Sequence, residues 1–267
     1  MNKKIVIYSS GTEHSRQVES LLRERLEGSG ITATDALSPD VELIVCIGGD
    51  GTFLQAVHAF GFPGIPFIGI NTGHLGFYQE IMPDQIDLFL ENYSEGRYRL
   101  QNMHCVKAIV RCDGVETEFA GLNEIVIRSA LSNSVHLDIS IGGAFIERFS
   151  GDGILIASPA GSTAYNYSLG GSIVDPRLRL LQVTPIAPMN TIAYRSFTSS
   201  ILLPPDLSLG IVPDTTGPLH RIRITYDSNS FEFDHIDDIE VKLSDVSVDL
   251  IRFESYDFWN KVKSKFL

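Results

Sequence analysis

The fold of this chain is decided by the stretch from Val41 to Leu54, which reads VELIVCIGGDGTFL. Its continuous apolar run, Leu43 to Ile47, is typical of a strand buried on both faces of a parallel sheet. A glycine turn with one acid, Asp50, follows, and helical spacing begins near Thr52. Glycines permit positive φ and a close approach to a ligand, and a helix N-terminus attracts anions. The residues predicted to bind phosphate are Gly48, Gly49, Gly51 and Thr52.

Asp50 is unusual in this turn, because its negative charge repels phosphate. Its presence therefore indicates another function. Accepting the proton of a hydroxyl that attacks phosphorus is such a function, so we predict a catalytic role for Asp50. The chain contains neither G-x-G-x-x-G nor G-x-x-x-x-G-K-[ST], which excludes the two common nucleotide-binding templates. A purely structural alternative remains, in which Gly48 and Gly49 end the strand and Asp50 caps the helix.

The pattern around this turn predicts an α/β domain with a doubly wound parallel sheet. Strands are expected at 4–8, 31–34, 43–47 and 67–70, with helices over 18–26, after the glycine turn, and from Pro83 to Gly96. Ligands of such sheets bind beyond the carboxyl ends of the strands, where Asp50 lies. The exit at 69–78, GINTGHLGFY, supplies a second glycine loop near that edge. Its aromatic residues Phe77 and Tyr78 suit either the core or stacking on a ligand.

From about Arg99 the chain changes to short β-branched runs separated by turn residues, which predicts an antiparallel, mostly β domain. Gly142-Gly143 is a two-residue hairpin signal. The last helix, expected over 256–266, carries Phe258, Trp259, Val262 and Phe266 on one side. We therefore expect an α/β domain over 1–98, a mostly β domain over 99–252, and a C-terminal helix within 253–267 that packs back on the first domain. The strands expected in the second domain lie at 104–111, 116–120, 124–128, 135–141, 145–149, 154–157, 200–203, 222–225, 239–243 and 246–252.

Composition excludes several classes of protein. The 267 residues include 21 Lys and Arg against 33 Asp and Glu, a formal charge of −12, so nucleic acid is not an expected partner. Three cysteines in apolar or strand-like surroundings indicate buried thiols and a cytoplasmic location. No apolar run approaches the roughly 18 residues that span a bilayer, so no membrane association is expected.

A second polar cluster, GDGILIASPAGSTAYNYSLGGSIVD at 151–175, is denser in Gly, Ser and Thr than a structural turn requires. After the strand 154–157, the hydroxyls at 162–163 are placed to open a short helix and cap it. Hydroxyls, backbone amides and the Tyr165 ring suit a ribose, a phosphate and a flat base. The alternative is a buried helix start capped by Ser162, which leaves Tyr165 and the pair Gly170-Gly171 unexplained.

Four motifs, in chain order, together resemble the NAD kinase family. They are GGDGTF at 48–53, NTGHLGF at 71–77, the Asn123-Glu124 pair in GLNEIVIRS, and GDGILIASPAGSTAYNYSLGG at 151–171. GGDGT alone is shared with diacylglycerol and sphingosine-type lipid kinases and, more loosely, with phosphofructokinases. TPIAP at 184–188 and the RF…FW ending at 252–259 extend the resemblance almost to the carboxyl end. The chain looks like the short, Gram-positive-like form, which implies the NAD kinase and diacylglycerol kinase fold.

The resemblance also implies roles for individual residues. Asp50 matches the family's proton acceptor, and Asn123 and Glu124 match the pair that holds the adenine side and a ribose of NAD. Tyr165 would pack against the nucleotide. Arg148 is included because Ser150 stands where the family usually has a basic residue; Ala160 likewise replaces a usual threonine, and Met189-Asn190 a histidine and a hydroxyl residue. The expected cofactor-binding residues are Gly51, Phe77, Tyr78, Asn123, Glu124, Arg148, Asp152, Ser158, Thr163, Ala164, Tyr165, Ser168 and Ala187.

The reaction implied is phosphorylation of the 2′-hydroxyl of the adenosine ribose of NAD, giving NADP, with ATP or polyphosphate as donor. A free aspartate has a pKa of about 3.9, far below that of an alcohol, so the proton must move late and catalysis lies in positioning and charge neutralisation. The acidic chain has no P-loop lysine, so Mg²⁺ should arrive with the donor, without protein side-chain ligands.

Two other functions remain open from the sequence. A lipid kinase shares GGDGT but should carry an apolar cleft and membrane-attracting basic residues, neither of which is evident. A non-catalytic NAD(P)-sensing module would keep the pocket without turnover, and the intact Asp50 argues against it. The resemblance further implies a homodimer or homotetramer.

Overall fold

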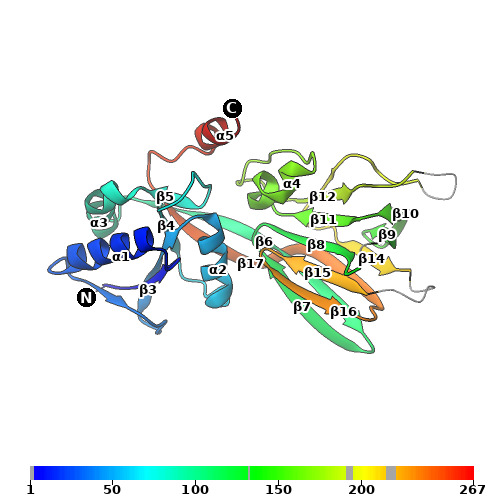
Figure 1. Cartoon of the computed structure of the whole chain (residues 1–267), viewed down its shortest axis with the longest axis horizontal. Coiled ribbons are helices and arrows are strands. Elements are labelled where there is room, and N and C mark those ends of the chain that lie inside the picture. Colours follow the sequence, from blue (N-terminus) through cyan, green and yellow to red (C-terminus); the bar gives the residue numbers. More distant parts are fainter. Residues whose placement is uncertain (1–2, 132, 191–194, 215–220) are drawn as a thin grey trace. The chain divides into compact units, whose positions relative to one another are not determined.

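The computed structural model describes residues 3–131, 133–190, 195–214 and 221–267, which fold as two units (Figure 1). Unit 1 comprises Met1–Asn102 and Val248–Leu267, and unit 2 comprises Met103–Ser247. The chain passes from one unit to the other within two long strands, β6 (Arg99–Cys112) and β17 (Asp238–Arg252). Each unit is described separately below.

Unit 1 is a doubly wound parallel sheet, as predicted. Its strands are β1 (Lys3–Ser9), β2 (Ile31–Thr34), β3 (Val41–Gly48), β4 (Phe67–Asn71) and β5 (Gln79–Ile81), joined by the end of β17. The order is β17, β4, β3, β1, β2, all paired in parallel, and β5 also pairs with β4. Because all these strands run the same way, the turns after β3 and β4 emerge at the same edge of the sheet.

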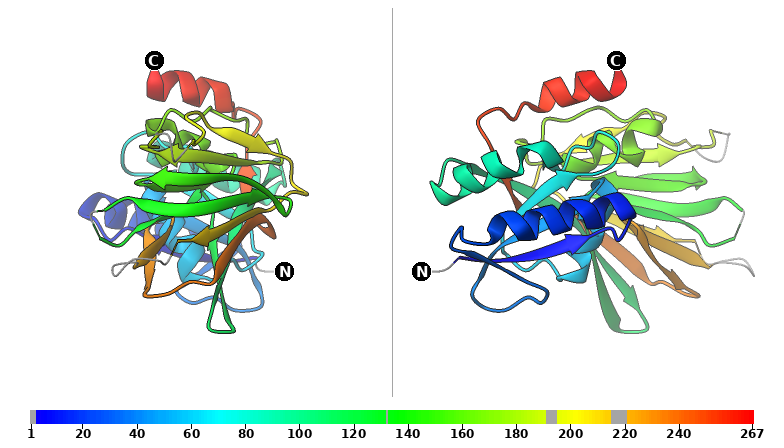
Figure 2. Two further views of the ribbon diagram at one scale, coloured as in Figure 1. Left: turned by 90° about the vertical axis from the view of Figure 1, so that its right-hand side faces the viewer. Right: turned by 60° about the vertical axis from the view of Figure 1, so that its left-hand side comes forward.

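Helices cover both faces of this sheet (Figure 2). They are α1 (Glu13–Leu26), α2 (Asp50–Ala59) and α3 (Ile86–Ser94), which follows a short 3₁₀ turn (Pro83–Gln85). The last helix, α5 (Phe258–Phe266), packs instead on Phe77 in the loop between β4 and β5. Leu22 of α1 and Phe89 of α3 share a core with Leu43 and Ile68. On the other face, Phe53 of α2 lies 5.5 Å from the Phe67 ring. Alternate residues of β3 and β4 therefore serve two cores, which explains their continuous apolar runs.

Unit 2 is mostly β, as predicted, and consists of antiparallel strands in two sheets. One contains β13, β12, β11, β8, β15 and β16 in that order, and the other contains β10, β9, β14 and β17, with β6 and β7 alongside. Side chains from both sheets form one core that includes Ile127, Leu137, Phe149 and Ile156. The bounds are β7 (Val115–Gly121), β8 (Glu124–Ser129), β9 (Val135–Ile141), β10 (Ala144–Gly151), β11 (Gly153–Ala157), β12 (Leu181–Ile186), β13 (Ile201–Leu203), β14 (Leu209–Pro213), β15 (Ile222–Tyr226) and β16 (Asn229–Phe233).

The structure corrects several expected elements. The expected strands 239–243 and 246–252 are one strand, β17, in which Ser244 continues the extended chain although its Oγ accepts a local hydrogen bond from the Val246 N–H at 3.0 Å. Four strands, β5, β12, β14 and β16, were not predicted, since β5 has only three residues and the others contain Pro, Gly or alternating polar residues. The hairpin at Gly142-Gly143 is confirmed, with φ of 57° and 82°.

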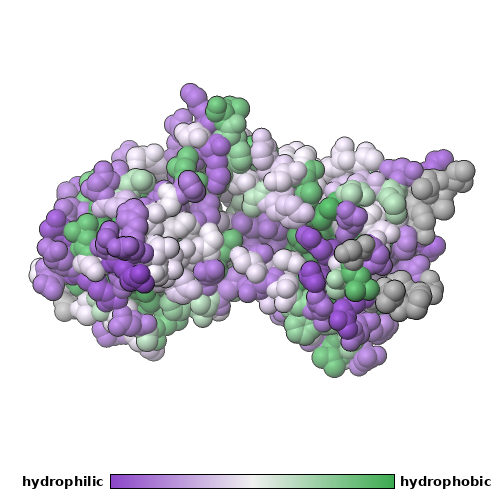
Figure 3. Space-filling view, viewed as in Figure 1, coloured by the Kyte–Doolittle hydropathy of each residue, from purple (hydrophilic) through white to green (hydrophobic). Residues whose placement is uncertain are grey.

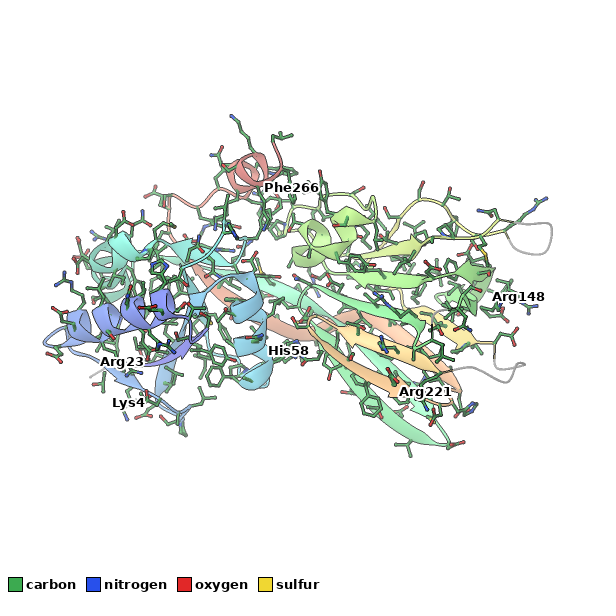
Figure 4. All side chains as sticks on the ribbon, viewed as in Figure 1. Lys4, Arg23, His58, Arg148, Arg221 and Phe266 are labelled. Atoms are coloured by element: carbon green, nitrogen blue, oxygen red, sulfur yellow. The ribbon has the colours of Figure 1, made fainter. Side chains whose placement is uncertain are left out.

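The C-terminal helix is shorter than expected and presents a different face. It begins at Phe258, after Asp257 caps the Trp259 and Asn260 N–H groups, instead of at Tyr256. The rings of Phe258 and Phe266 lie 5.7 and 6.0 Å from the Phe77 ring. Figure 4 labels Phe266 on this helix. Trp259 is 51% exposed, so its expected place on the packed side is wrong.

Candidate active site

The glycine turn after β3 differs from the expected geometry. None of Gly48, Gly49 and Gly51 has positive φ, and α2 begins at Asp50, not near Thr52. Gly48 is needed for space, because a Cβ there would overlap the Thr52 side chain, whereas Cβ atoms on Gly49 and Gly51 would meet open space. The glycines therefore bring the strand close to its own helix and leave the turn uncovered. Phosphate binding there by Gly48, Gly49, Gly51 and Thr52 stays a prediction.

Asp50 is fixed by the loop between β4 and β5. Its Oδ2 accepts a hydrogen bond from the Phe77 N–H at 2.9 Å, and its Oδ1 accepts one from the Tyr78 N–H at 3.0 Å. Gly76 permits this approach, since a Cβ at that position would overlap the carboxylate. The helix cap is Gly49, without a side-chain hydrogen bond, so Asp50 does not cap α2. Its carboxylate instead joins two glycine loops at one edge of the sheet.

Phe77 and Tyr78 belong to the core of unit 1. Both are buried, and Tyr78 stacks on Phe53 with ring centroids 4.7 Å apart. Phe77 packs against α5. These contacts account for both rings through packing, the first of the two roles that the sequence left open. A contact of either ring with a nucleotide stays a prediction.

In unit 2, Asp227 holds the Asn123-Glu124 pair in place. Its carboxylate accepts hydrogen bonds from Leu122 N at 2.8 Å, Asn123 N at 2.7 Å and Glu124 N at 3.4 Å. Asp227 N in turn donates to Glu124 O at 3.1 Å. One carboxylate in the turn between β15 and β16 thus fixes the start of β8. Sequence reasoning missed Asp227, because an acid in a hairpin turn ordinarily indicates only a turn.

Glu124 is a buried acid without a partner on one oxygen. It is 8% exposed, and Oε2 makes no hydrogen bond within the described residues. Burial raises the pKa of Glu124 to about 8, and the negative charge of Asp227 adds to the shift. Near neutral pH the carboxyl is therefore largely protonated, so it can donate a hydrogen bond as well as accept one.

Replacing Glu124 with Gln should stabilise the fold at pH 8. Because the folded pKa lies above the unfolded one, this group contributes stability below about pH 4.5 that is lost as pH rises to about 8. A glutamine does not ionise, so the variant should unfold roughly 3–6 °C higher than wild type at pH 8, with a smaller difference at pH 5. Thermal unfolding at both pH values measures this, with the exposed Glu24→Gln as control. Parallel pH profiles for wild type and Glu124→Gln would contradict the assignment.

The segment after β11 closes tightly on the same pair. Ser158 N donates to Asn123 O at 2.9 Å, and Ser158 Oγ donates to Leu122 O at 2.6 Å while accepting from Gly161 N. A Cβ on Gly161 would overlap the main chain of Asn123. The structure thus brings Asn123, Glu124 and Ser158 together.

Replacing Gly161 with Ala should destabilise unit 2. Main-chain atoms of Asn123 block the new methyl, and their hydrogen bonds to Ser158 and Asp227 prevent them from moving aside. Overpacking of this kind costs about 1–3 kcal/mol, which corresponds to roughly 3–10 °C in the unfolding temperature. Differential scanning calorimetry would measure it. An unfolding temperature equal to that of wild type would show that the loop adjusts freely.

The expected helix caps after β11 are wrong. A 3₁₀ turn (Ala160–Thr163) leads into the short α4 (Tyr165–Ser168), and neither has a side-chain cap. Ser162 Oγ instead donates to Val174 O and accepts from Val174 N, at 3.2 and 3.0 Å. The pair Gly170-Gly171 also has a structural reason, since Gly170 has φ of 82° and a Cβ on Gly171 would overlap the buried Asn166.

The remaining predicted site residues lie in several settings. Tyr165 is 37% exposed, with the Arg128 guanidinium 6.0 Å from its ring. Asp152 is exposed and borders a surface hollow of about 400 Å³. Arg148 pairs with Asp138 across the β9–β10 hairpin, Nε to Oδ1 at 2.8 Å (Figure 4). Thr163 is buried, Ala164 is half-buried, and Ser168 and Ala187 are exposed, Ala187 with φ of 45°.

Within the described residues, no group of three or more His, Cys, Asp or Glu side chains could hold a metal ion. Across the same ranges, no helix is long and apolar enough to cross a membrane.

Comparison with known proteins identifies the family. Residues 10–98 match the profile of the ATP-NAD kinase N-terminal domain, and residues 122–253 match that of the C-terminal domain. An NAD kinase of Finegoldia magna is 36% identical over 100% of this chain and 99% of its own length. NAD kinase 1 of Oceanobacillus iheyensis is 34% identical over 100% of this chain and 98% of its own length.

Two solved structures share the fold. A yeast NADH kinase complexed with NADH has a TM-score of 0.85 at 20% identity, covering 98% of this chain and 87% of its own. An NAD kinase from Archaeoglobus fulgidus in complex with ATP has a TM-score of 0.75 at 22% identity, and the match covers 98% of this chain and 99% of that structure's chain. The motifs, both domain profiles and the full-length relatives agree, and the chain belongs to the NAD kinase family.

Proposed function

We propose that this protein transfers the terminal phosphoryl group of ATP to the 2′-hydroxyl of the adenosine ribose of NAD, giving NADP and ADP. The observation that carries the proposal is the position of Asp50, whose carboxylate is fixed by two main-chain N–H groups at the edge of a doubly wound sheet. Each oxygen retains a lone pair, and the side chain is 27% exposed, so a hydroxyl can still approach it.

In the proposed step, the ribose 2′-oxygen forms a bond to the terminal phosphorus, and the bond from that phosphorus to the bridging oxygen breaks. ADP leaves with the bonding electron pair, and the hydroxyl proton passes to Asp50. Because phosphorus carries most of the charge change, the protein contributes mainly by positioning the hydroxyl and neutralising phosphate oxygens. The open turn at Gly49 and Gly51, with the N-terminus of α2, supports donor binding there.

Recognition of NAD is proposed for the Asn123-Glu124 pair and the segment after β11. The protonated carboxyl of Glu124 can donate to a ring nitrogen or a ribose oxygen, and Asp227 keeps it in position. The exposed ring of Tyr165 is available to pack on the nucleotide. The remaining contacts that we propose on the family resemblance are with Gly51, Phe77, Tyr78, Arg148, Asp152, Ser158, Thr163, Ala164, Ser168 and Ala187.

We also propose that Mg²⁺ enters with the phosphates of the donor, because this hard cation binds phosphate oxygens readily and keeps several of its waters. Polyphosphate remains a second possible donor. When bound, the cation would neutralise charge on the phosphate oxygens. The domain limits that we propose are 1–98 for the α/β domain that carries GGDGT, with the helix of 253–267 packed back on it, and 99–252 for the mostly β domain of NAD binding and oligomerisation.

For assembly, we propose a homodimer or homotetramer in the cytoplasm. Unit 2 exposes apolar side chains such as Phe145, Phe197 and Phe231, and the surface view shows apolar areas on this unit (Figure 3). Cys46 and Cys105 are buried thiols, whereas Cys112, which was also expected to be buried, is half-buried. Free thiols of this kind support a reducing compartment. Light scattering coupled to gel filtration would give the number of subunits.

The function is tested by incubating purified protein with NAD, ATP and Mg²⁺ and assaying NADP with an NADP-specific dehydrogenase. NADP that accumulates only when all components are present supports the proposal. Binding of NAD without NADP formation would indicate a sensing module, and phosphorylation of diacylglycerol instead would indicate a lipid kinase. Substituting polyphosphate for ATP in the same assay tests the second donor.

A further inference from the structure

Helix α5 packs against the rest of unit 1 and directs two lysines toward β5 and the loop before it. Phe258, Val262 and Phe266 follow helical spacing, and Lys261 and Lys265 fall within the same stripe. Lys261 Nζ donates to Gln79 O, and Lys265 Nζ donates to Leu75 O at 3.1 Å. Trp259 and Lys263 lie on the exposed side. Lys261 is half-buried and Lys265 is exposed, but both side chains reach main-chain oxygens instead of extending into water.

Lys265 lies beside the proposed proton acceptor. Its Nζ is 3.9 Å from Oδ2 of Asp50 and 5.2 Å from the centre of the Phe77 ring. Its side chain is 34% exposed, so a ligand of Asp50 can also reach Nζ. An ammonium group has three donors, and the bond to Leu75 O uses one of them. At 3.9 Å from the carboxylate it makes no hydrogen bond there, which leaves donors for a ligand at the same place.

A positive charge is needed at this position for a physical reason. Asp50 would repel the phosphoryl group that it has to face, and the chain has no P-loop lysine. Lys261 is less suitable, because burial and the charge of Arg252 lower its pKa to about 8, and it is turned toward Gln79 O.

We propose that Lys265 is a catalytic residue of the phosphoryl transfer, whose ammonium group binds the transferred phosphate beside Asp50. This rests on the proposed function. The lysine keeps its proton throughout, while the proton of the hydroxyl goes to Asp50 and ADP leaves with the electron pair. Helix α5 thus supplies from the carboxyl end of the chain the cation that a P-loop lysine supplies elsewhere.

The test is a comparison of Lys265→Gln with the matched control Lys263→Gln. Both variants lose one positive charge from α5, but only the first loses it beside Asp50, and glutamine can still donate to Leu75 O. We expect Lys265→Gln to lower kcat about 10- to 100-fold and to raise the KM for ATP, with the KM for NAD within about twofold of wild type. Lys265→Arg should keep most activity, and Lys263→Gln should match wild type.

Three results would count against the inference, and they separate its failure from that of the function. If wild type forms no NADP, the proposed function itself is wrong. If wild type is active and Lys265→Gln equals Lys263→Gln, only the role of Lys265 is wrong. If Lys265→Gln and Lys265→Arg lose activity equally, together with a lower unfolding temperature, the lysine merely anchors α5.

Discussion

Replacing Asp50 with asparagine is expected to lower kcat by about 10²- to 10⁴-fold, the contribution typical of a positioned general base. The carboxylate is the proposed acceptor of the hydroxyl proton, and an amide cannot take it. The geometry adds a second effect, because Phe77 N and Tyr78 N both donate to this side chain. Asparagine has one acceptor oxygen, so one of these N–H groups would face an NH₂ group at a cost of about 1–3 kcal/mol.

Steady-state kinetics, NAD titration by calorimetry and thermal unfolding together measure these effects. The fold should persist, since a loss of this size is small beside the stability of a typical domain. NAD affinity should change far less than kcat. Asp206→Asn, on an exposed turn of unit 2, makes the same chemical change and should behave as wild type. Full turnover by Asp50→Asn would contradict the assignment of Asp50 as the proton acceptor.

Replacing Arg252 with methionine is expected to destabilise unit 1 by about 3–5 kcal/mol, or roughly 10 °C in the unfolding temperature. Arg252 is fully buried and pairs with Glu80, which is 2% exposed, at 2.9 Å. Its other nitrogens donate to Gln101 Oε1 at 2.8 Å and Phe77 O at 2.9 Å, and its guanidinium lies 3.8 Å from the Tyr256 ring. Methionine fills much of the volume but leaves the Glu80 charge buried without its partner.

The double variant Arg252→Met with Glu80→Gln provides the control, because it removes both charges. It should recover part of the lost stability, although the Phe253 N–H would lose a charged acceptor. Since Arg252 also holds Phe77 O in the loop that fixes Asp50, the single variant should lower kcat as well. Exposed Arg177, paired with Asp175, offers a comparison, and Arg177→Met should change the unfolding temperature by little. A single variant as stable as wild type would show that the pair contributes no net stability.

Much of the fold could be predicted from local pattern alone. The apolar run from Leu43 to Ile47 and the spacing of apolar residues in α1 and α3 predict directly which faces of these elements are buried. Errors arose where the pattern was short or interrupted. Gln79–Ile81 has only three residues, and Ser244 within β17 resembled a turn although the chain continues extended. In each case, pairing with another strand fixes the extended conformation, and the residues near it in sequence do not predict that pairing.

The candidate site shows the same division. Asp50 and the Asn123-Glu124 pair lie in motifs that can be recognised along the chain, whereas Asp227, Arg252 and Lys265 lie in stretches with ordinary explanations. Asp227 is 103 residues from Glu124, and Arg252 is 172 residues from Glu80. No periodicity connects positions so far apart.

By itself the sequence determined most of the strands and helices of unit 1, which acid stands in the glycine turn, and to which family the motifs point. These properties depend on near neighbours and on the order of short motifs, so they can be read along the chain. The tertiary structure alone decided that the carboxylate of Asp50 is held by Phe77 and Tyr78, that Glu124 is buried beside Asp227, and that α5 places Lys265 next to Asp50. Hydrogen bonds, burial and charge act through space, and only folding brings such distant residues together.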